Sequence, residues 1–284
     1  MKTVDNIILD SKHNNKKILL DVRWNESSEP KDLILFIHGF KGFKDWGYFN
    51  LMADYFTDKG FAFSKLNLSH NGTTPEKPSD FDDLEAFGNN NFSIELDDIG
   101  TTIDYLYSED STLKKSGVSI NRLILLGHSR GGGLAILKTG EDERINVVAA
   151  LAPIHNLKKR WSDEVLEVWK KDGVMTIENS RTKQIMPLYY QLVENTLENY
   201  SRLDIPNTVR NLSVPIFVAH GTSDETLPVE YAHELKTWND QVELMIVQEG
   251  NHTFGGKHPY EKNELPQHAF EVLEKLSHFL EKHT

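Results

Sequence analysis

The fold of this chain is decided by the stretch Leu123-Ile124-Leu125-Leu126-Gly127-His128-Ser129-Arg130-Gly131-Gly132-Gly133. It opens with an uninterrupted aliphatic run, which is typical of a strand buried on both faces of a parallel sheet. A Gly-x-Ser-x-Gly turn and a helix rich in small residues follow. A strand, such a turn and a helix in this order form an elbow that exposes a serine hydroxyl at the edge of a sheet. We therefore expect a strand–turn–helix unit with Ser129 at its apex.

Ser129 is the candidate nucleophile, although the pentapeptide alone is weak evidence. At ordinary glycine and serine frequencies, roughly one chain of this length in ten contains such a match by chance. A glycine-rich turn with an incidental serine is the alternative. The position of the motif, between a buried strand and a helix, favours the nucleophile.

Strand and helix patterns alternate along the rest of the chain. Short β-branched or aliphatic runs predict strands, and longer segments with apolar residues at helical spacing predict helices. The expected strands span residues 4–9, 18–22, 33–37, 61–66, 123–126, 147–151, 214–218 and 244–247. The expected helices span residues 46–59, 94–107, a segment after 129, and 264–282, where Phe270, Leu273, Leu276 and Leu280 form one apolar stripe.

This alternation predicts an α/β fold with a mostly parallel, eight-stranded sheet and helices on both faces. The first two strands have no helix between them, so we expect an antiparallel hairpin at one edge of the sheet. Such sheets bind ligands beyond the carboxyl ends of their strands. The residues that directly follow each strand are therefore the candidates for a functional site.

Two connections are long enough to carry structure of their own. Residues 70–91 are rich in Asn, Pro, Gly and Asp, whereas residues 155–207 contain helix-like pieces and many large side chains. We interpret residues 155–207 as a helical cap inserted into a core formed by residues 1–154 and 208–284. The cap contains the basic residues Lys158, Lys159, Arg160, Lys170, Lys171 and Arg181. A solvated helix face is the favoured interpretation of these charges, and attraction of a carboxylate-bearing substrate is the alternative.

An acid and a base follow Ser129 in the chain, each in a loop just past an expected strand. A serine hydroxyl needs a base to take its proton, and that base needs an acid to orient it. Asp224 and then His252 supply these groups in the chain order that this kind of sheet requires. We predict a catalytic triad of Ser129, Asp224 and His252, with Glu225 as the rival acid. An ordinary turn aspartate and a surface histidine are the alternative.

The tetrahedral intermediate of such a reaction needs two N–H donors for its oxyanion. We expect one from the amide of Arg130 and the other from the amide of Phe40, in the loop that follows an early strand. A glycine turn that merely joins strand to helix is the alternative. The side chains of Phe40, His128 and Trp161 are candidates for the substrate pocket.

Four features together resemble the α/β-hydrolase superfamily. They are His38-Gly39-Phe40, Gly127-His128-Ser129-Arg130-Gly131, Asp224 with Leu227-Pro228, and Gly250-Asn251-His252. Within the superfamily, the chain looks like the branch of cinnamoyl (feruloyl) esterases, other carboxylesterases and dienelactone-hydrolase-like proteins. The resemblance extends from about residue 30 to the end of the chain. It implies the α/β-hydrolase fold and a hydrolytic enzyme.

The sequence differs from the patterns of several α/β-hydrolase families, and these differences limit what the resemblance implies. The chain has no cysteine, so it lacks the nucleophile of dienelactone hydrolases proper. Ser129 stands where haloalkane dehalogenases carry an aspartate. Many relatives have an Asp-x-x-Gly-His-Gly stretch where this chain has Asn67-Leu68-Ser69-His70-Asn71-Gly72. No part of residues 155–207 matches a signature that defines a substrate.

Composition narrows the expected partners. The chain has 284 residues and a formal net charge of −12, which argues against nucleic acid or an anionic membrane as the main partner. Without cysteine it can form no disulfide and no thiolate metal site. His38, His128 and His220 lack the spacing of a zinc site, so we expect no metal and no cofactor. The sequence has neither a signal-peptide pattern nor a membrane span, and we expect a cytoplasmic monomer or homodimer.

These features predict a serine hydrolase that cleaves a carboxylic ester of a small molecule through an acyl-enzyme. Cleavage of an amide, a peptide or a thioester by the same triad is the alternative among enzymes. A ligand-binding homologue that no longer turns over is the alternative from another class.

Overall fold

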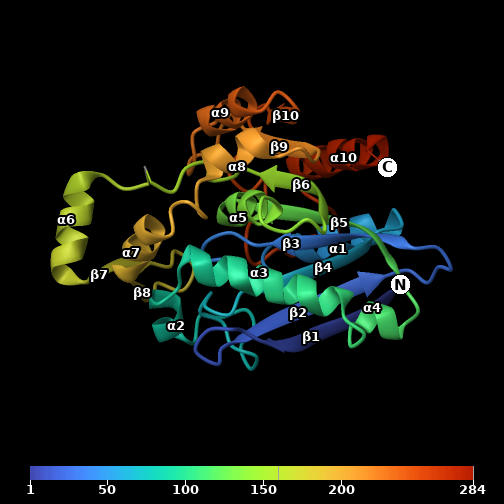
Figure 1. The fold of residues 1–284 in the computed structure, drawn as a ribbon, viewed down its shortest axis with the longest axis horizontal. Coiled ribbons are helices and arrows are strands. Elements are labelled where there is room, and N and C mark those ends of the chain that lie inside the picture. The colour runs from blue at the N-terminus through green and yellow to red at the C-terminus, as the bar shows by residue number, and fades with distance from the viewer. Residues whose placement is uncertain (159, 284) are drawn as a thin grey trace.

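The computed structural model describes residues 1–158 and 160–283, and its centre is an eight-stranded sheet (Figure 1). The strands lie in the order β1-β2-β4-β3-β5-β6-β9-β10. β2 pairs antiparallel with β1 and with β4, and the other neighbours in the sheet pair in parallel. The predicted sheet and its antiparallel edge hairpin are therefore confirmed. The strands are β1 (Lys2–Asp10), β2 (Lys17–Trp24), β3 (Lys31–Ile37), β4 (Ala62–Asn67), β5 (Ile120–His128), β6 (Ile145–Leu151), β9 (Ile216–Gly221) and β10 (Val242–Val247).

Both faces of the central strands are apolar, because helices cover both. Successive residues of a strand point to opposite faces. On β3, Leu33, Leu35 and Ile37 belong to one buried cluster, whereas Ile34 and Phe36 belong to another. The first cluster includes residues of α3 (Phe92–Tyr107) and α5 (Arg130–Thr139), and the second includes residues of α1 (Phe49–Asp58) and α10 (Gln267–Lys282).

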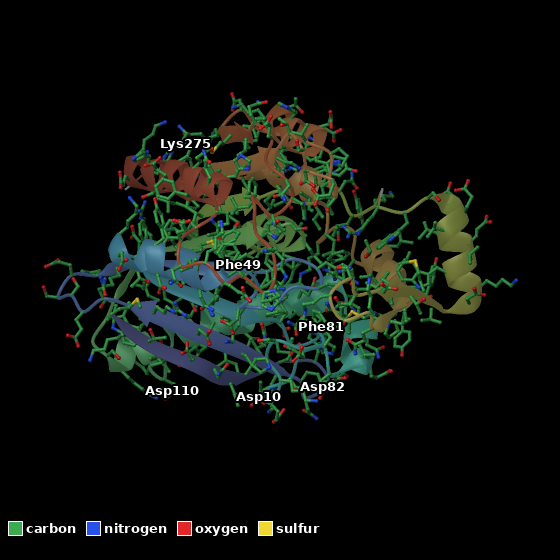
Figure 2. The ribbon with its side chains drawn as sticks, turned by 180° about the vertical axis from the view of Figure 1, so that it is seen from behind. Asp10, Phe49, Phe81, Asp82, Asp110 and Lys275 are labelled. Carbon is green, nitrogen blue, oxygen red and sulfur yellow. The ribbon has the colours of Figure 1, made fainter. Side chains whose placement is uncertain are left out.

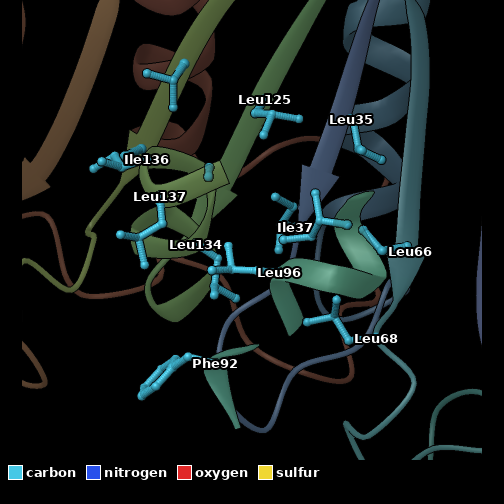
Figure 3. Packing of buried hydrophobic residues seen from close by; sticks show 14 of the residues in the cluster. Leu35, Ile37, Leu66, Leu68, Phe92, Leu96, Leu125, Leu134, Ile136 and Leu137 are labelled. Carbon is cyan, nitrogen blue, oxygen red and sulfur yellow. The ribbon is translucent and has the colours of Figure 1, made fainter. Parts of the chain in front are cut away.

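Figure 3 shows the first cluster at the carboxyl end of β3. Leu96 of α3 and Leu134 of α5 lie close to Ile37 of β3, and all three side chains are buried. Burial of an aliphatic side chain contributes roughly 1.5–3 kcal/mol to the free energy of unfolding. This packing holds the start of α5, and with it Ser129, against the strand ends.

Helix α10 departs from the predicted apolar stripe at its first turn. Leu273, Leu276 and Leu280 are buried as predicted, but Phe270 is 44% exposed. Ala269, one residue earlier, faces the sheet in the first turn, so Phe270 is rotated about 100° away from it. The predicted stripe was wrong at this one position.

The cap is not wholly helical, which corrects the prediction for residues 155–207. It contains α6 (Asp163–Asp172), an antiparallel hairpin of β7 (Val174–Glu178) and β8 (Ile185–Tyr189), and α7 (Gln191–Glu198). Alternate residues are buried in β8 and partly buried in β7, a period of two that the helical interpretation overlooked. The boundary predicted at residue 207 falls inside α8 (Ile205–Asn211), which packs against α5.

The cap lies at one end of the molecule, with α6 farthest from the sheet (Figure 1). Trp169 of α6 is buried, and its indole N–H donates to the carbonyl oxygen of Leu188 at 2.8 Å, which ties α6 to the hairpin. Among the described residues, no helix has the length and apolarity needed to cross a membrane. The remaining helices are α2 (Leu84–Gly88), α4 (Thr112–Lys115) and α9 (Glu230–Trp238).

Three buried charged side chains and the partly exposed Asp45 form a cluster between β2, β4 and the loop after β3. Asp21 and Lys65 are opposite each other in the β2–β4 register, and their side chains are 2% and 1% exposed. Asp21 Oδ2 accepts from Lys65 Nζ at 2.5 Å and from Lys44 Nζ at 2.8 Å, and Asp45 pairs with both lysines. Burial would raise the pKa of Asp45, but the adjacent ammonium groups lower it to about 2. Asp45 is therefore ionised at neutral pH.

Lys65→Met tests whether these charges depend on one another. The substitution leaves the buried Asp21 and the partly exposed Asp45 with one cation, so the free energy of unfolding should fall by about 3–5 kcal/mol in a urea titration. Lys17→Met is the matched control, because Lys17 pairs with Asp10 at the exposed edge of the sheet, and it should cost less than about 1 kcal/mol. Equal effects of the two substitutions would contradict this account.

Candidate active site

Ser129 lies at the turn between β5 and α5, in a backbone conformation that few residues other than glycine adopt. Its φ is 56° and its ψ is −117°. The flanking glycines allow this turn, because a Cβ on Gly127 would lie 2.1 Å from the carbonyl oxygen of Gly131. A Cβ on Gly131 would likewise lie 2.2 Å from the carbonyl oxygen of Ile37. The predicted elbow thus requires glycine on both sides of Ser129.

The structure brings the three residues of the predicted triad together. Nε2 of His252 lies 2.9 Å from Oγ of Ser129, and Nδ1 of His252 lies 2.8 Å from Oδ2 of Asp224. Asp224 follows β9 and His252 follows β10, so the loops at three strand ends converge. At these distances the ring nitrogen of His252 can accept from the serine hydroxyl while the other nitrogen donates to the carboxylate.

Asp224, rather than Glu225, contacts the imidazole of His252. Its side chain is fully buried, and Oδ1 accepts from the amides of Thr226 and Leu227 at 2.8 Å each. Burial alone would raise the pKa of Asp224, but hydrogen bonds from His220, His252 and the Leu227 amide hold it well below its usual range. Glu225 is exposed, and its Oε2 accepts from the backbone N–H of His252 at 3.4 Å.

His220 is a second neighbour of this carboxylate, and the sequence analysis considered it only as a metal ligand. It is fully buried at the end of β9, with Nε2 3.0 Å from Oδ2 of Asp224 and 3.0 Å from the carbonyl oxygen of Leu227. Both neighbours are acceptors, so Nε2 carries the hydrogen. The sequence contained one signal for this contact: His220 precedes Asp224 by four residues, across a tight loop.

The side chains of His128 and His38 form hydrogen bonds to backbone carbonyl groups near the serine. His128 Nε2 donates to the carbonyl oxygen of His252 at 2.8 Å, and His38 Nδ1 donates to that of Gly39 at 2.8 Å. Burial and the neighbouring His252 lower the pKa of His128 to about 3. Burial lowers the pKa of His38 to about 4. Both rings are therefore neutral at pH 7.

The amides expected to form the oxyanion hole are close to Ser129. A Cβ placed on Gly39 would lie 3.0 Å from Cβ of Ser129, so the loop that carries Phe40 runs directly beside this serine. Within the described residues, neither the Phe40 nor the Arg130 amide donates a backbone hydrogen bond. The Arg130 side chain is engaged in the core, where Nε donates to Glu95 at 2.7 Å.

An open cavity of about 610 Å³ adjoins the serine hydroxyl. Phe40 and His128 line it, as predicted for substrate-binding residues. Trp161 does not, because its ring packs edge-on against Trp169 with centroids 5.3 Å apart. Its neighbour Arg160 lines the cavity instead. The role of Trp161 in the substrate pocket stays a prediction.

The strand-end histidines do not gather around a common point. In residues 1–158 and 160–283, no three His, Cys, Asp or Glu side chains are grouped as they would be to hold a metal ion. The buried contacts of His38, His128 and His220 are hydrogen bonds to protein groups.

Comparison with known proteins gives the family of the chain. The sequence profile of the prolyl oligopeptidase family matches residues 47–283. The chain belongs to the prolyl oligopeptidase family. This family member is also 24% identical, over 199 residues, to the AB hydrolase superfamily protein YisY of Bacillus subtilis (strain 168), a match that covers 60% of this chain and 72% of the relative.

Solved structures show the same fold as this prolyl oligopeptidase family member. Est1E from Butyrivibrio proteoclasticus, solved with ferulic acid bound, superposes with a TM-score of 0.70 at 15% identity and 98% coverage of both chains. The mouse alpha/beta hydrolase domain-containing protein 10 superposes with a TM-score of 0.70 at 13% identity, over 98% of this chain and 99% of the other. The resemblance to the α/β-hydrolase superfamily is confirmed, and the chain is a hydrolase.

The buried histidines predict how stability depends on pH. An unfolded histidine titrates near pH 6.5, whereas the pKa values of His38 and His128 are about 4 and about 3 in the folded chain. Between pH 6.5 and about 4 the unfolded state binds protons that the folded state does not. The contribution of His38 and His128 to the free energy of unfolding is therefore complete above pH 6.5. It is lost as the pH falls, by up to about 3 kcal/mol for each histidine at pH 4.

Urea titrations between pH 7.5 and 4.5 measure this dependence. The variant His128→Gln should show a shallower fall of unfolding free energy with pH than the wild type, because a neutral residue replaces a titrating one. His278→Gln, at an exposed position of α10, controls for removal of a histidine as such. An unchanged slope in His128→Gln would contradict the assignment.

Proposed function

We propose that this hydrolase cleaves a carboxylic ester through an acyl-enzyme formed on Ser129. The observation that carries the proposal is the continuous hydrogen-bonded series from Ser129 Oγ through His252 to Asp224, beside an open cavity. A hydroxyl so placed can lose its proton to the imidazole as it attacks. Asp224, held ionised by its hydrogen bonds, stabilises the imidazolium that forms.

The proposed reaction has two halves that use the same groups. Ser129 Oγ forms a bond to the acyl carbon as His252 Nε2 takes its proton, and the Phe40 and Arg130 amides donate to the oxyanion. The intermediate collapses, the ester C–O bond breaks, and His252 returns the proton to the leaving alcohol. Water then attacks the acyl-enzyme, with His252 again taking and returning a proton, and the carboxylic acid leaves.

An ester is favoured as the substrate on the grounds of the pocket and the fold. The cavity volume lies within the usual range for small-molecule sites, roughly 300–1,000 Å³. Its lining includes Phe43, Trp46, Phe49 and Phe81, which suit an aromatic or long aliphatic group. An esterase fold solved with ferulic acid bound superposes on nearly the whole chain, which supports the same substrate class.

Peptide cleavage is the second candidate, because the family profile that matches the chain is that of prolyl oligopeptidases. The same serine, base and oxyanion donors serve both reactions. The two differ in the leaving group, since an amine must be protonated before it departs.

Ser129→Ala should abolish the proposed reaction. Without the nucleophile, kcat/KM for p-nitrophenyl acetate should fall by at least about 10⁴-fold. A fluorophosphonate probe should label the wild type and fail to label both Ser129→Ala and His252→Ala. Ser116→Ala, at an exposed position, is the matched control and should keep both activity and labelling. An unlabelled wild type would favour a ligand-binding protein.

Matched ester and amide substrates should separate the two candidate reactions. We expect kcat/KM for p-nitrophenyl acetate to exceed that for p-nitroacetanilide and for a prolyl p-nitroanilide by at least about 10³-fold. The rates are read from the nitrophenol and nitroaniline absorbances. A prolyl anilide cleaved as fast as the ester would overturn the esterase proposal and favour the peptidase.

A further inference from the structure

The charges around the cavity have the opposite sign to the charge of the whole chain. Lys41, Arg160, Arg181 and Lys257 line it, and Glu225 is the only carboxylate among the described residues of that lining. The whole chain has a formal net charge of −12. Figure 2 shows acidic residues such as Asp10, Asp82 and Asp110 at the periphery of the molecule. A cationic cleft on an acidic protein attracts anions selectively.

Three of these cations lack a counter-ion among the described residues. Arg181 pairs with Asp80 at 3.3 Å, but Lys41, Arg160 and Lys257 form no ion pair in that part of the chain. They come from three loops, which follow β3, β6 and β10. Three unpaired positive charges therefore converge from separate strand ends on one cavity.

Arg160 is the most informative of the three, because it is half-buried. Burial and the nearby Arg130 lower its pKa to about 10, so it remains positive at neutral pH. Glu95, whose charge acts on Arg160, already accepts from Arg130 Nε at 2.7 Å. Partial removal of a cation from water is costly unless an anion compensates it. A bound anionic group would provide that compensation.

The cavity also has an apolar floor, so its ligand is not a simple inorganic anion. Phe43, Trp46, Phe49 and Phe81 line it, and Phe49 and Phe81 are buried. The Trp46 ring stacks on His258, with centroids 6.3 Å apart, and His258 and Lys257 also line the cavity. An aromatic body on this floor would place a charged substituent near the cations.

We propose that the natural substrate is an anionic ester, with an aromatic or similarly apolar body that bears a carboxylate. The inference rests on the proposed function of Ser129 and assigns its substrate class. Arg160, Lys41 and Lys257 bind the carboxylate, while the ester carbonyl lies at Ser129. This revises the interpretation of the basic cap residues as only a solvated helix face, because Arg160 and Arg181 face the site.

Two pairs of rigid esters test the proposal with the intact protein. One pair places the charge on the acyl side: mono-(4-nitrophenyl) terephthalate against 4-nitrophenyl 4-carbamoylbenzoate. The other places it on the alcohol side: 4-acetoxybenzoate against 4-acetoxybenzamide. In at least one pair, kcat/KM for the carboxylate should exceed that for the amide by about tenfold or more at low ionic strength. The preference should shrink severalfold in about 0.5 M NaCl, because salt screens partly exposed charges.

Single substitutions identify the cations responsible. Arg160→Gln, Lys41→Gln and Lys257→Gln should each reduce kcat/KM for the preferred carboxylate by about threefold to tenfold. Turnover of the neutral partner should change by less than about twofold, which also shows that each variant is folded. Lys170→Gln, at an exposed position of α6, is the matched control and should change neither rate.

The outcomes separate this inference from the proposed function. If neutral esters are hydrolysed by Ser129 but neither pair shows a preference for the carboxylate, the anionic substrate class is wrong and the esterase stands. A preference for the carboxylate that is changed neither by salt nor by any of the three substitutions also overturns the assignment. If no ester of either pair is hydrolysed, both the proposed function and this inference fail.

Discussion

The close approach of backbone to backbone at the nucleophile elbow is the constraint on which the rest of the structure depends. Gly127 and Gly131 leave no room for a Cβ, and the second of them packs against the carbonyl of Ile37 on the neighbouring strand. This contact joins β5, α5 and β3 at one point. It holds Ser129 at a positive φ, and it draws the loop after β3 to the same place. The site is therefore a consequence of how closely a helix can approach a sheet.

Around that point the protein arranges charge in two different ways. Asp224 is fully buried and saturated with donors, so its charge is fixed and directed at His252. The cations at the cavity have few protein partners and stay available to a ligand. In the first arrangement, hydrogen bonds hold one side chain in one orientation. In the second, charge is left uncompensated by protein, which suits recognition of a substrate.

The sequence predicted the sheet and the place of each triad residue because both depend on local patterns. Apolar runs, glycine-rich turns and residues just past strand ends can be recognised without knowledge of long-range contacts. The hairpin of residues 174–178 and 185–189 was missed, since short alternating segments resemble pieces of helix when their partner is unknown. Phe270 was misplaced for a related reason. Which neighbour in a turn faces the core depends on the packing of elements distant in sequence.

The sequence by itself determined the strand–turn–helix elbow, the polarity of the sheet and the chemical types of the three triad residues. Only the tertiary structure decided that Asp224 rather than Glu225 contacts His252, that His220 shares its carboxylate, and that Arg160 rather than Trp161 lines the cavity. The physical reason is the same in each case. Adjacent loop residues differ by small rotations of the backbone, and only contacts between separate strand ends fix those rotations.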